Sequence, residues 1–127
     1  MKKQQRDAFR VHHMVLACEK IAKFIVGKNL PDLLNDDLLA SGVERQLEIL
    51  GEAASHVSAE TQVEWADLNW RGMKDARNFI AHEYFRADYV KIWDTAQHVV
   101  PYELPALKEV LAVLEARFGS PEDDADV

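Results

Sequence analysis

The sequence is poor in cysteine, glycine and proline, and it contains no long run of apolar residues. A single cysteine, Cys18, excludes an intramolecular disulfide, and its place among apolar residues at helical spacing predicts a core position. Five glycines and four prolines among 127 residues exclude a fibrous or low-complexity chain. No stretch approaches the roughly 18 to 20 apolar residues of a membrane span, and no signal-like segment follows the start. We therefore expect a cytoplasmic protein with no membrane partner.

An excess of positive charge is also missing. The chain carries 15 basic and 22 acidic residues, a formal net charge of -7, which argues against a nucleic-acid partner. Four of the acids, Glu122, Asp123, Asp124 and Asp126, lie at the end, so residues 1–121 carry 18 acidic and the same 15 basic residues. Between residues 71 and 91, five basic residues accompany three acidic ones. This local excess is compatible with a phosphate-binding site, although a solvated helix face would show it too.

Apolar residues recur every three to four positions over most of the chain. This spacing predicts helices over residues 4–26 and 37–57, the second capped by Asp36, then a third helix after Asn69 and a fourth after Asp88. No segment shows the period of two that is typical of strands. We predict an all-α domain over residues 1–119, an antiparallel bundle of four to five helices, followed by an acidic disordered tail over residues 120–127.

Local features refine this bundle. Gly27 can supply a left-handed cap to the first helix. Gly51 lies inside the second helix, where glycine costs about 1 kcal/mol relative to alanine, so we expect another helix to cross closely there. The fourth helix should break or kink at Pro101, because an interior proline loses a backbone hydrogen bond. One face of the third helix is expected to carry Trp70, Met73, Arg77, Ile80 and Tyr84. The inward face of the fourth is expected to carry Val90, Trp93 and Val100.

The residues best suited to chemistry lie between positions 77 and 84. Arg77 supplies a guanidinium that grips phosphate oxygens with a planar fork, and His82 supplies the side chain whose unperturbed pKa lies near neutrality. An ideal α-helix stacks Asn78 and His82 on one face, whereas Arg77 and His82 project about 140° apart. They could touch one ligand only at the rim of a cleft or where the helix distorts. A structural role also stays open, with Arg77 paired to Asp75 or to an acid on another helix and His82 capping a helix end.

A longer pattern contains these residues. The run Arg77-Asn78-Phe79-Ile80-Ala81-His82-Glu83-Tyr84-Phe85 resembles the R-x-x-x-x-H-x-Y signature of HepT-like proteins, a branch of the HEPN superfamily of helical ribonucleases. The similarity extends upstream to Leu50-Gly51-Glu52-Ala53-Ala54 and to Asn69-Trp70, and downstream to Asp88 and Trp93. It covers roughly residues 35–111. The region from Trp93 to Pro105 departs from the pattern, because two prolines lie four residues apart where one is expected.

The resemblance implies a HEPN-like fold and a metal-independent endoribonuclease toxin of a type VII-like toxin-antitoxin system, with RNA as substrate and no cofactor. It implies a homodimer in which the motifs of two subunits face one cleft, with Arg77 and His82 as catalytic residues and Asn78 in a supporting role. A second His82 would then complete the acid and base pair that one histidine cannot supply. Tyr84 matches the tyrosine that a partner, a minimal nucleotidyltransferase antitoxin, AMPylates to neutralise the toxin.

Other sites and functions have less support. His12 and His13 are adjacent and diverge by about 100° on a helix, so with one cysteine the sequence offers no metal site. His56 and His98 are expected to be surface or hydrogen-bonded residues, and the three tryptophans to be core residues. One alternative is a non-catalytic substrate- or nucleotide-binding subunit of a minimal nucleotidyltransferase, which the acidic net charge favours. Another is a helical interaction bundle with no active cleft.

Overall fold

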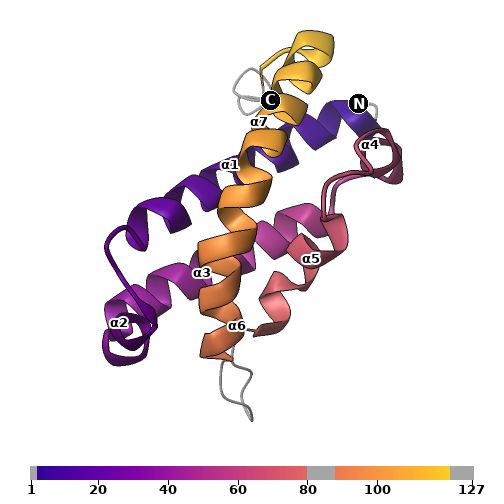
Figure 1. Ribbon diagram of the computed structural model, residues 1–127. Coiled ribbons are helices and arrows are strands. Elements are labelled where there is room, and N and C mark those ends of the chain that lie inside the picture. Colours follow the sequence, from indigo (N-terminus) through magenta and orange to yellow (C-terminus); the bar gives the residue numbers. More distant parts are fainter. Residues whose placement is uncertain (1–2, 80–87, 121–127) are drawn as a thin grey trace.

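The fold is built from three long helices. The computed structural model describes residues 3–79 and 88–120, and every element within those ranges is helical (Figure 1). The long helices are α1 (Lys3–Phe24), α3 (Asp37–Ser55) and α7 (Val100–Phe118). Four short ones, α2 (Leu30–Asn35), α4 (Ala59–Glu64), α5 (Trp70–Asp75) and α6 (Tyr89–Asp94), lie between them. The predicted all-α class is confirmed.

Helix α1 forms the centre of the core, because it packs against both α3 and α7. It runs antiparallel to each of them. A loop joins its end to α2 and the start of α3, and Asp7 near its start binds Ser58 just beyond the end of α3. At the same end, Glu64 accepts hydrogen bonds from Gln4 of α1 and Arg117 of α7. The fully buried side chains of the three helices include Val11, Met14, Cys18, Ile21, Val43, Leu47, Leu50, Leu107, Val110 and Leu114.

The first two predicted helices are confirmed with small changes at their ends. Helix α1 ends at Phe24 rather than residue 26, and Gly27 adopts the expected left-handed conformation with φ of +71°. Helix α3 begins at Asp37, and Asp36 caps it by accepting hydrogen bonds from the Leu38 and Leu39 N–H groups. The segment between them was expected to be a connector. It instead forms α2, because Asn29 and Asp32 make a reciprocal capping box.

The segment between residues 58 and 68 was expected to be irregular, but it contains the short helix α4. The Ser58 hydroxyl caps this helix by accepting a hydrogen bond from the Thr61 N–H. Six residues are too few for apolar periodicity to reveal a helix, so only the cap at Ser58 signalled it in the sequence.

The last helical region differs from its prediction. Asp88 caps α6 as expected, and Trp93 and Val100 are buried, but Val90 is 66% exposed and does not face inward. The expected break or kink at Pro101 is replaced by a π-helical turn, Thr95–Val99, directly before α7, in which the Val100 N–H donates to the Thr95 carbonyl. The regular α-helical pattern is thus interrupted just ahead of Pro101, whose nitrogen cannot donate a hydrogen bond.

Membrane insertion was not expected, and the described ranges contain no helix that is long and apolar enough to cross a bilayer.

Candidate functional site

The segment that carries Arg77 is anchored from α5. Asn69 caps α5 as predicted, because its side chain accepts a hydrogen bond from the Gly72 N–H at 2.9 Å. Trp70 is buried and donates its indole N–H to the Trp65 carbonyl at 2.9 Å. After Asp75 the chain tightens into a 3-10 helix, Ala76–Phe79, which packs against α3. The backbone of Arg77 is therefore fixed by buried neighbours on the preceding turns.

A 3-10 turn at this position changes two expectations about Arg77. The third helix was expected to present Arg77 on the same face as Trp70 and Met73. Those two residues are buried, but the next inward residue is Ala76, and Arg77 is exposed. The expected 140° between Arg77 and His82 assumed 3.6 residues per turn, whereas a 3-10 helix has 3.0. The assumed ideal α-helix is therefore wrong at residues 76–79.

Gly51 is the point where α3 meets this segment, as its position inside a helix predicted. A Cβ atom added to Gly51 would lie 3.1 Å from the Arg77 Cβ, 3.1 Å from the Lys74 carbonyl oxygen and 3.3 Å from the Arg77 nitrogen. Two of these three atoms belong to the backbone, which cannot turn away as a side chain can. The glycine therefore lets α3 approach the Arg77 backbone this closely, because a Cβ would push that segment away by a few tenths of an ångström.

Glu52, the next residue on α3, holds the Arg77 side chain. The Arg77 guanidinium donates a hydrogen bond to one Glu52 carboxylate oxygen at 2.8 Å, and the His56 imidazole lies 3.0 Å from the other. The interaction with His56, one turn further along α3, is the main cause that lowers the pKa of Glu52, and Arg77 lowers it further. Glu52 is thus an anion between two cationic or potentially cationic side chains.

This geometry confirms that Arg77 pairs with an acid on another helix. The alternative partner, Asp75, instead lies 3.8 Å from Arg71 on the same helix. The Arg77 side chain nevertheless remains 46% exposed. An arginine has five donor N–H groups, so a guanidinium held by one carboxylate can still bind a phosphate from the solvent side.

The predicted site residues divide into two groups. Arg77 and Asn78 lie side by side in the sequence, and both are exposed. His82 and Tyr84 lie outside the described residues, so their places in the site remain predictions. The role of Glu52 was missed, although two signals were present: its place beside Gly51 in the segment that resembles the family, and its spacing of four residues from His56, which suits a helical ion pair.

The remaining candidates behave as structural residues. Cys18 is fully buried, and burial raises the pKa of its thiol to about 12. Trp70 and Trp93 are in the core as predicted. Trp65 is only half-buried, and the Arg117 guanidinium carbon lies over its indole, 5.5 Å from the centre of the ring. His98 lies on the surface as expected. Across residues 3–79 and 88–120, no three histidine, cysteine or carboxylate side chains gather as a metal site would need.

Comparison with known proteins adds an independent finding. Residues 14–114 match the protein family described as Ribonuclease HepT-like. A candidate RNase of Caldanaerobacter subterraneus subsp. tengcongensis is 29% identical over 101 residues, which cover 80% of this chain and 90% of that protein. A candidate RNase of Methanocaldococcus jannaschii is 26% identical over 101 residues, 80% of this chain and 92% of its own length. A protein of Thermococcus cleftensis named probable ribonuclease HepT is 29% identical over 101 residues, 80% of this chain and 90% of that protein. No solved structure matches the chain significantly.

Proposed function

Because the chain belongs to the HepT-like ribonuclease family, we propose that it is a metal-independent endoribonuclease toxin of a type VII-like toxin-antitoxin system. The observation that supports this best is the placement of Arg77. Its backbone is fixed where α5 crosses α3 at Gly51, its guanidinium is held by Glu52, and almost half of its side chain remains open to solvent. A preorganised, accessible guanidinium is what stabilisation of a phosphorane-like transition state requires.

The reaction proposed is attack of an RNA 2′-hydroxyl on the adjacent phosphorus. The 2′-oxygen forms a bond to phosphorus, the bond to the 5′-oxygen breaks, and the products are a 2′,3′-cyclic phosphate and a 5′-hydroxyl. One imidazole takes the proton of the 2′-hydroxyl and another gives a proton to the leaving oxygen. We assign these steps to His82, the charge stabilisation to Arg77, and the orientation of the histidine or the phosphate to Asn78.

The chemistry needs a base and an acid, and each chain offers one His82. We therefore propose a homodimer in which two motifs share one cleft. A mixed dimer of wild-type and His82→Ala chains, isolated through two different affinity tags, tests this directly. If both histidines serve one cleft, the mixed dimer cleaves as poorly as the mutant homodimer. Half of the wild-type rate in the mixed dimer would show instead that each subunit works alone.

Tyr84 is the proposed point of control. A partner of the minimal nucleotidyltransferase class would transfer AMP from ATP, with the Tyr84 oxygen attacking the α-phosphorus and pyrophosphate leaving. Bulk and negative charge would then lie seven residues from Arg77 and would exclude RNA by contact and by repulsion. Intact-mass measurement after coexpression with such a transferase should show added AMP that Tyr84→Phe abolishes.

The main test of the proposed activity uses unmodified dimer, purified without any partner. We expect it to cut single-stranded RNA in the presence of EDTA, and we expect Arg77→Ala and His82→Ala each to lower the rate by at least about a hundredfold. Arg71→Ala is the matched control, because Arg71 is a 94% exposed arginine on the same segment. Equal activity of the wild-type and His82→Ala proteins in EDTA would refute the proposal.

A second candidate is a non-catalytic subunit that binds a nucleotide or substrate for a minimal nucleotidyltransferase. The net charge of -7 favours it, and so does the pairing of Arg77 with Glu52, which offsets the charge that RNA would meet. In this case the protein binds AMP or the transferase tightly, while its expression alone leaves cellular RNA and growth intact.

A further inference from the structure

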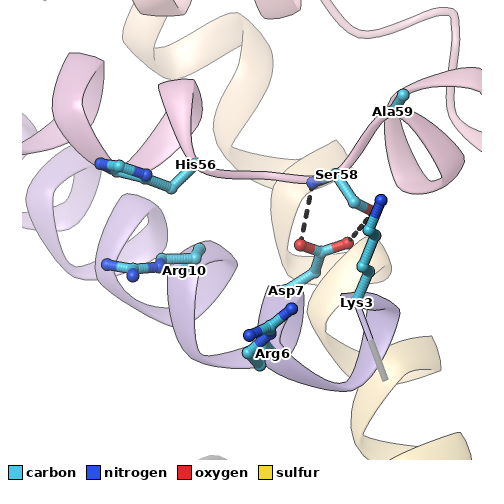
Figure 2. A pocket seen from close by; sticks show the side chains of 7 residues that line it. All are labelled: Lys3, Arg6, Asp7, Arg10, His56, Ser58 and Ala59. Atoms are coloured by element: carbon cyan, nitrogen blue, oxygen red, sulfur yellow. Dashed lines mark hydrogen bonds between the residues drawn. The ribbon is translucent and has the colours of Figure 1, made fainter. Parts of the chain in front are cut away.

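A second group of cationic side chains lies away from Arg77, at the start of α1. A hollow of about 380 Å³ separates the first two turns of α1 from the segment that joins α3 to α4. Figure 2 shows Lys3, Arg6 and Arg10 along α1 and His56 on the facing segment. Positions 3, 6 and 10 recur at helical spacing and therefore share one side of α1. None of these residues has a role in the proposed cleavage step.

Asp7, which also lines the hollow, does not pair with these cations. It is 1% exposed, and its carboxylate accepts a hydrogen bond from the Ser58 N–H at 2.9 Å and from the hydroxyls of Ser58 and Thr61, each at 2.5 Å. A carboxylate offers about four acceptor positions, so neutral donors from α4 and its cap occupy most of them. Asp7 therefore ties α1 to α4, and Figure 2 shows its dashed bonds turned toward Ser58.

The positive charges of the three cationic side chains take no part in the ion pairs that stabilise the described residues. None of the ion pairs among the described residues includes Lys3, Arg6 or Arg10, although the chain has 22 acidic residues. Even with the single charge of Asp7 counted, three cations leave the hollow with an excess of two positive charges. Positive side chains near a helix N-terminus also oppose the helix dipole. Stability of α1 therefore does not explain their presence.

The hollow is continuous with the surface that holds Arg77. Arg10 also lines a second hollow of about 240 Å³, between α1 and α3, and Glu52 lines that second hollow. The other end of this path is Arg77, because Glu52 holds its guanidinium. His56 binds the same carboxylate and faces the first hollow. The second hollow is lined by Arg10 and Arg45 and also by Glu48 and Glu52, so the excess of positive charge lies at Lys3, Arg6 and Arg10. An extended strand that runs from Arg77 past Glu52 would meet this excess where it reaches Arg10.

We propose that the hollow at Lys3, Arg6 and Arg10 binds a phosphodiester group of the RNA strand, away from the bond that is cut, and so positions the strand across Arg77. The inference rests on RNA being the substrate in the proposed function. The ligand is a strand backbone rather than a free nucleotide, because the described residues that line the hollow are mainly cationic or small and polar, and their single ring is the His56 imidazole, which also binds Glu52. Arg6 and Arg10 are thus positioning residues.

The test measures binding of a fluorescent 12-nucleotide RNA whose 2′-hydroxyls are methylated, so that no cleavage can occur. The variant is Arg6→Gln with Arg10→Gln. Its matched control is Lys20→Gln with Lys23→Gln, which removes the same charge from exposed positions at the other end of α1. We expect the Kd of the first variant to rise at least about tenfold at low salt. Its slope of log Kd against log salt concentration should fall by about 0.7, since one phosphate contact to a single strand contributes about that much.

Further arms separate the alternatives. Arg6→Lys with Arg10→Lys should restore most of the slope, because phosphate attraction needs the charge. Equal losses in the Arg6/Arg10 and Lys20/Lys23 variants would overturn the proposal, since net charge alone would then explain binding. Displacement of the 12-nucleotide RNA by AMP at comparable concentration would also overturn it, because the hollow would then prefer a mononucleotide.

Failure of this inference can be told from failure of the proposed function. A dinucleotide has one phosphodiester, which is the bond that is cut, and therefore offers no second phosphodiester to the hollow. The Arg6/Arg10 variant should cleave it at the wild-type rate and show a raised KM only on longer RNA. A wild-type protein that cleaves neither substrate refutes the ribonuclease, whereas the binding measurement still decides whether the hollow holds a strand.

Discussion

Glu52 shows how much one side chain can organise at this surface. Its two carboxylate oxygens bind two different side chains, Arg77 from another helical segment and His56 from its own helix. All three groups are substantially exposed, so solvent screens their charges and the pairs contribute little to folding. The main effect of the arrangement is to fix the position of the Arg77 side chain. An arginine side chain has many rotamers, and the carboxylate selects the one that lies along α3.

The first prediction follows from this positional role. Glu52→Gln keeps the shape of the side chain but removes the charge, so Arg77 should become less ordered. We expect RNA cleavage to fall by about tenfold to a hundredfold, because small displacements of a catalytic group have effects of that size. Thermal unfolding should barely change. Glu48→Gln is the control, because Glu48 forms an exposed ion pair with Arg45 on the same helix. Wild-type cleavage by Glu52→Gln would contradict the assignment.

Cys18 gives a second prediction at the scale of one residue. Burial is the main cause that raises the pKa of its thiol to about 12, and the charge of Glu103 adds to it. At pH 8 only about one thiol in ten thousand is then ionised, and none is accessible. Iodoacetamide should leave the folded protein unlabelled for hours and should label the protein quickly in urea. Rapid labelling of the folded protein would show that α1 separates from its neighbours.

At the scale of elements, the crossing of α3 with the Arg77 segment depends on an absent side chain. Gly51 faces backbone atoms of that segment, whereas Gly42, nine residues earlier on the same helix, faces only the ring of Phe24. The two glycines are equivalent in helix propensity and differ in what surrounds them. Alanine substitutions at the two positions therefore compare a Cβ placed against backbone atoms with a Cβ placed against a side chain that can move.

Gly51→Ala should lower the free energy of unfolding by about 1 kcal/mol, because overpacking costs about 1–3 kcal/mol and exceeds the gain of about 1 kcal/mol in helix propensity. It should also reduce RNA cleavage, since the Arg77 backbone must move. Gly42→Ala meets the Phe24 ring at 3.3 Å, and a side chain can shift by a few tenths of an ångström. We expect that variant to be neutral or slightly stabilised in urea unfolding. A reversed order of the two variants would disprove the tight crossing.

At the scale of the whole molecule, Glu103 links stability to pH. This residue of α7 is 4% exposed, and its carboxylate accepts a hydrogen bond from the Asn69 N–H at 3.4 Å. Burial raises the pKa of Glu103, with the Asn69 bond acting in the opposite direction. Folding therefore favours the protonated acid. Its contribution to stability is complete below the ordinary glutamate pKa and is lost as the pH rises through the higher value of the folded state.

Glu103→Gln should consequently be more stable than the wild type at neutral pH, and this advantage should shrink as the pH falls toward 4. Urea unfolding at several pH values gives the comparison. The lowered pKa values of Glu52 and Glu64 make stability fall in acid, but they affect both proteins equally. Glu109→Gln, an exposed change on the same helix, should show no such trend. The same trend in both variants would remove Glu103 as its source.

Much of the scaffold was predictable because each long helix carries its own signal. The apolar period located α1 and α3. Helix starts were marked by capping residues, whose side chains accept hydrogen bonds from the first N–H groups of a helix: Asp36, Asn69 and Asp88. The short helices α2 and α4 were missed, since a single turn and a half cannot establish a period. Val90 was misplaced because the inward residues of α6 are Ile92 and Trp93, whereas Val90, in the first turn, faces solvent.

The sequence by itself determined the helical class, the main caps, the burial of Cys18 and the membership signalled by the run from Arg77 to Tyr84, because these depend on residues that are neighbours along the chain. Only the tertiary structure decided which acid holds Arg77, which backbone atoms Gly51 faces, and that Arg6 and Arg10 share a hollow with His56. These facts join segments separated by 25 to 50 positions, and no local period or spacing encodes such distances.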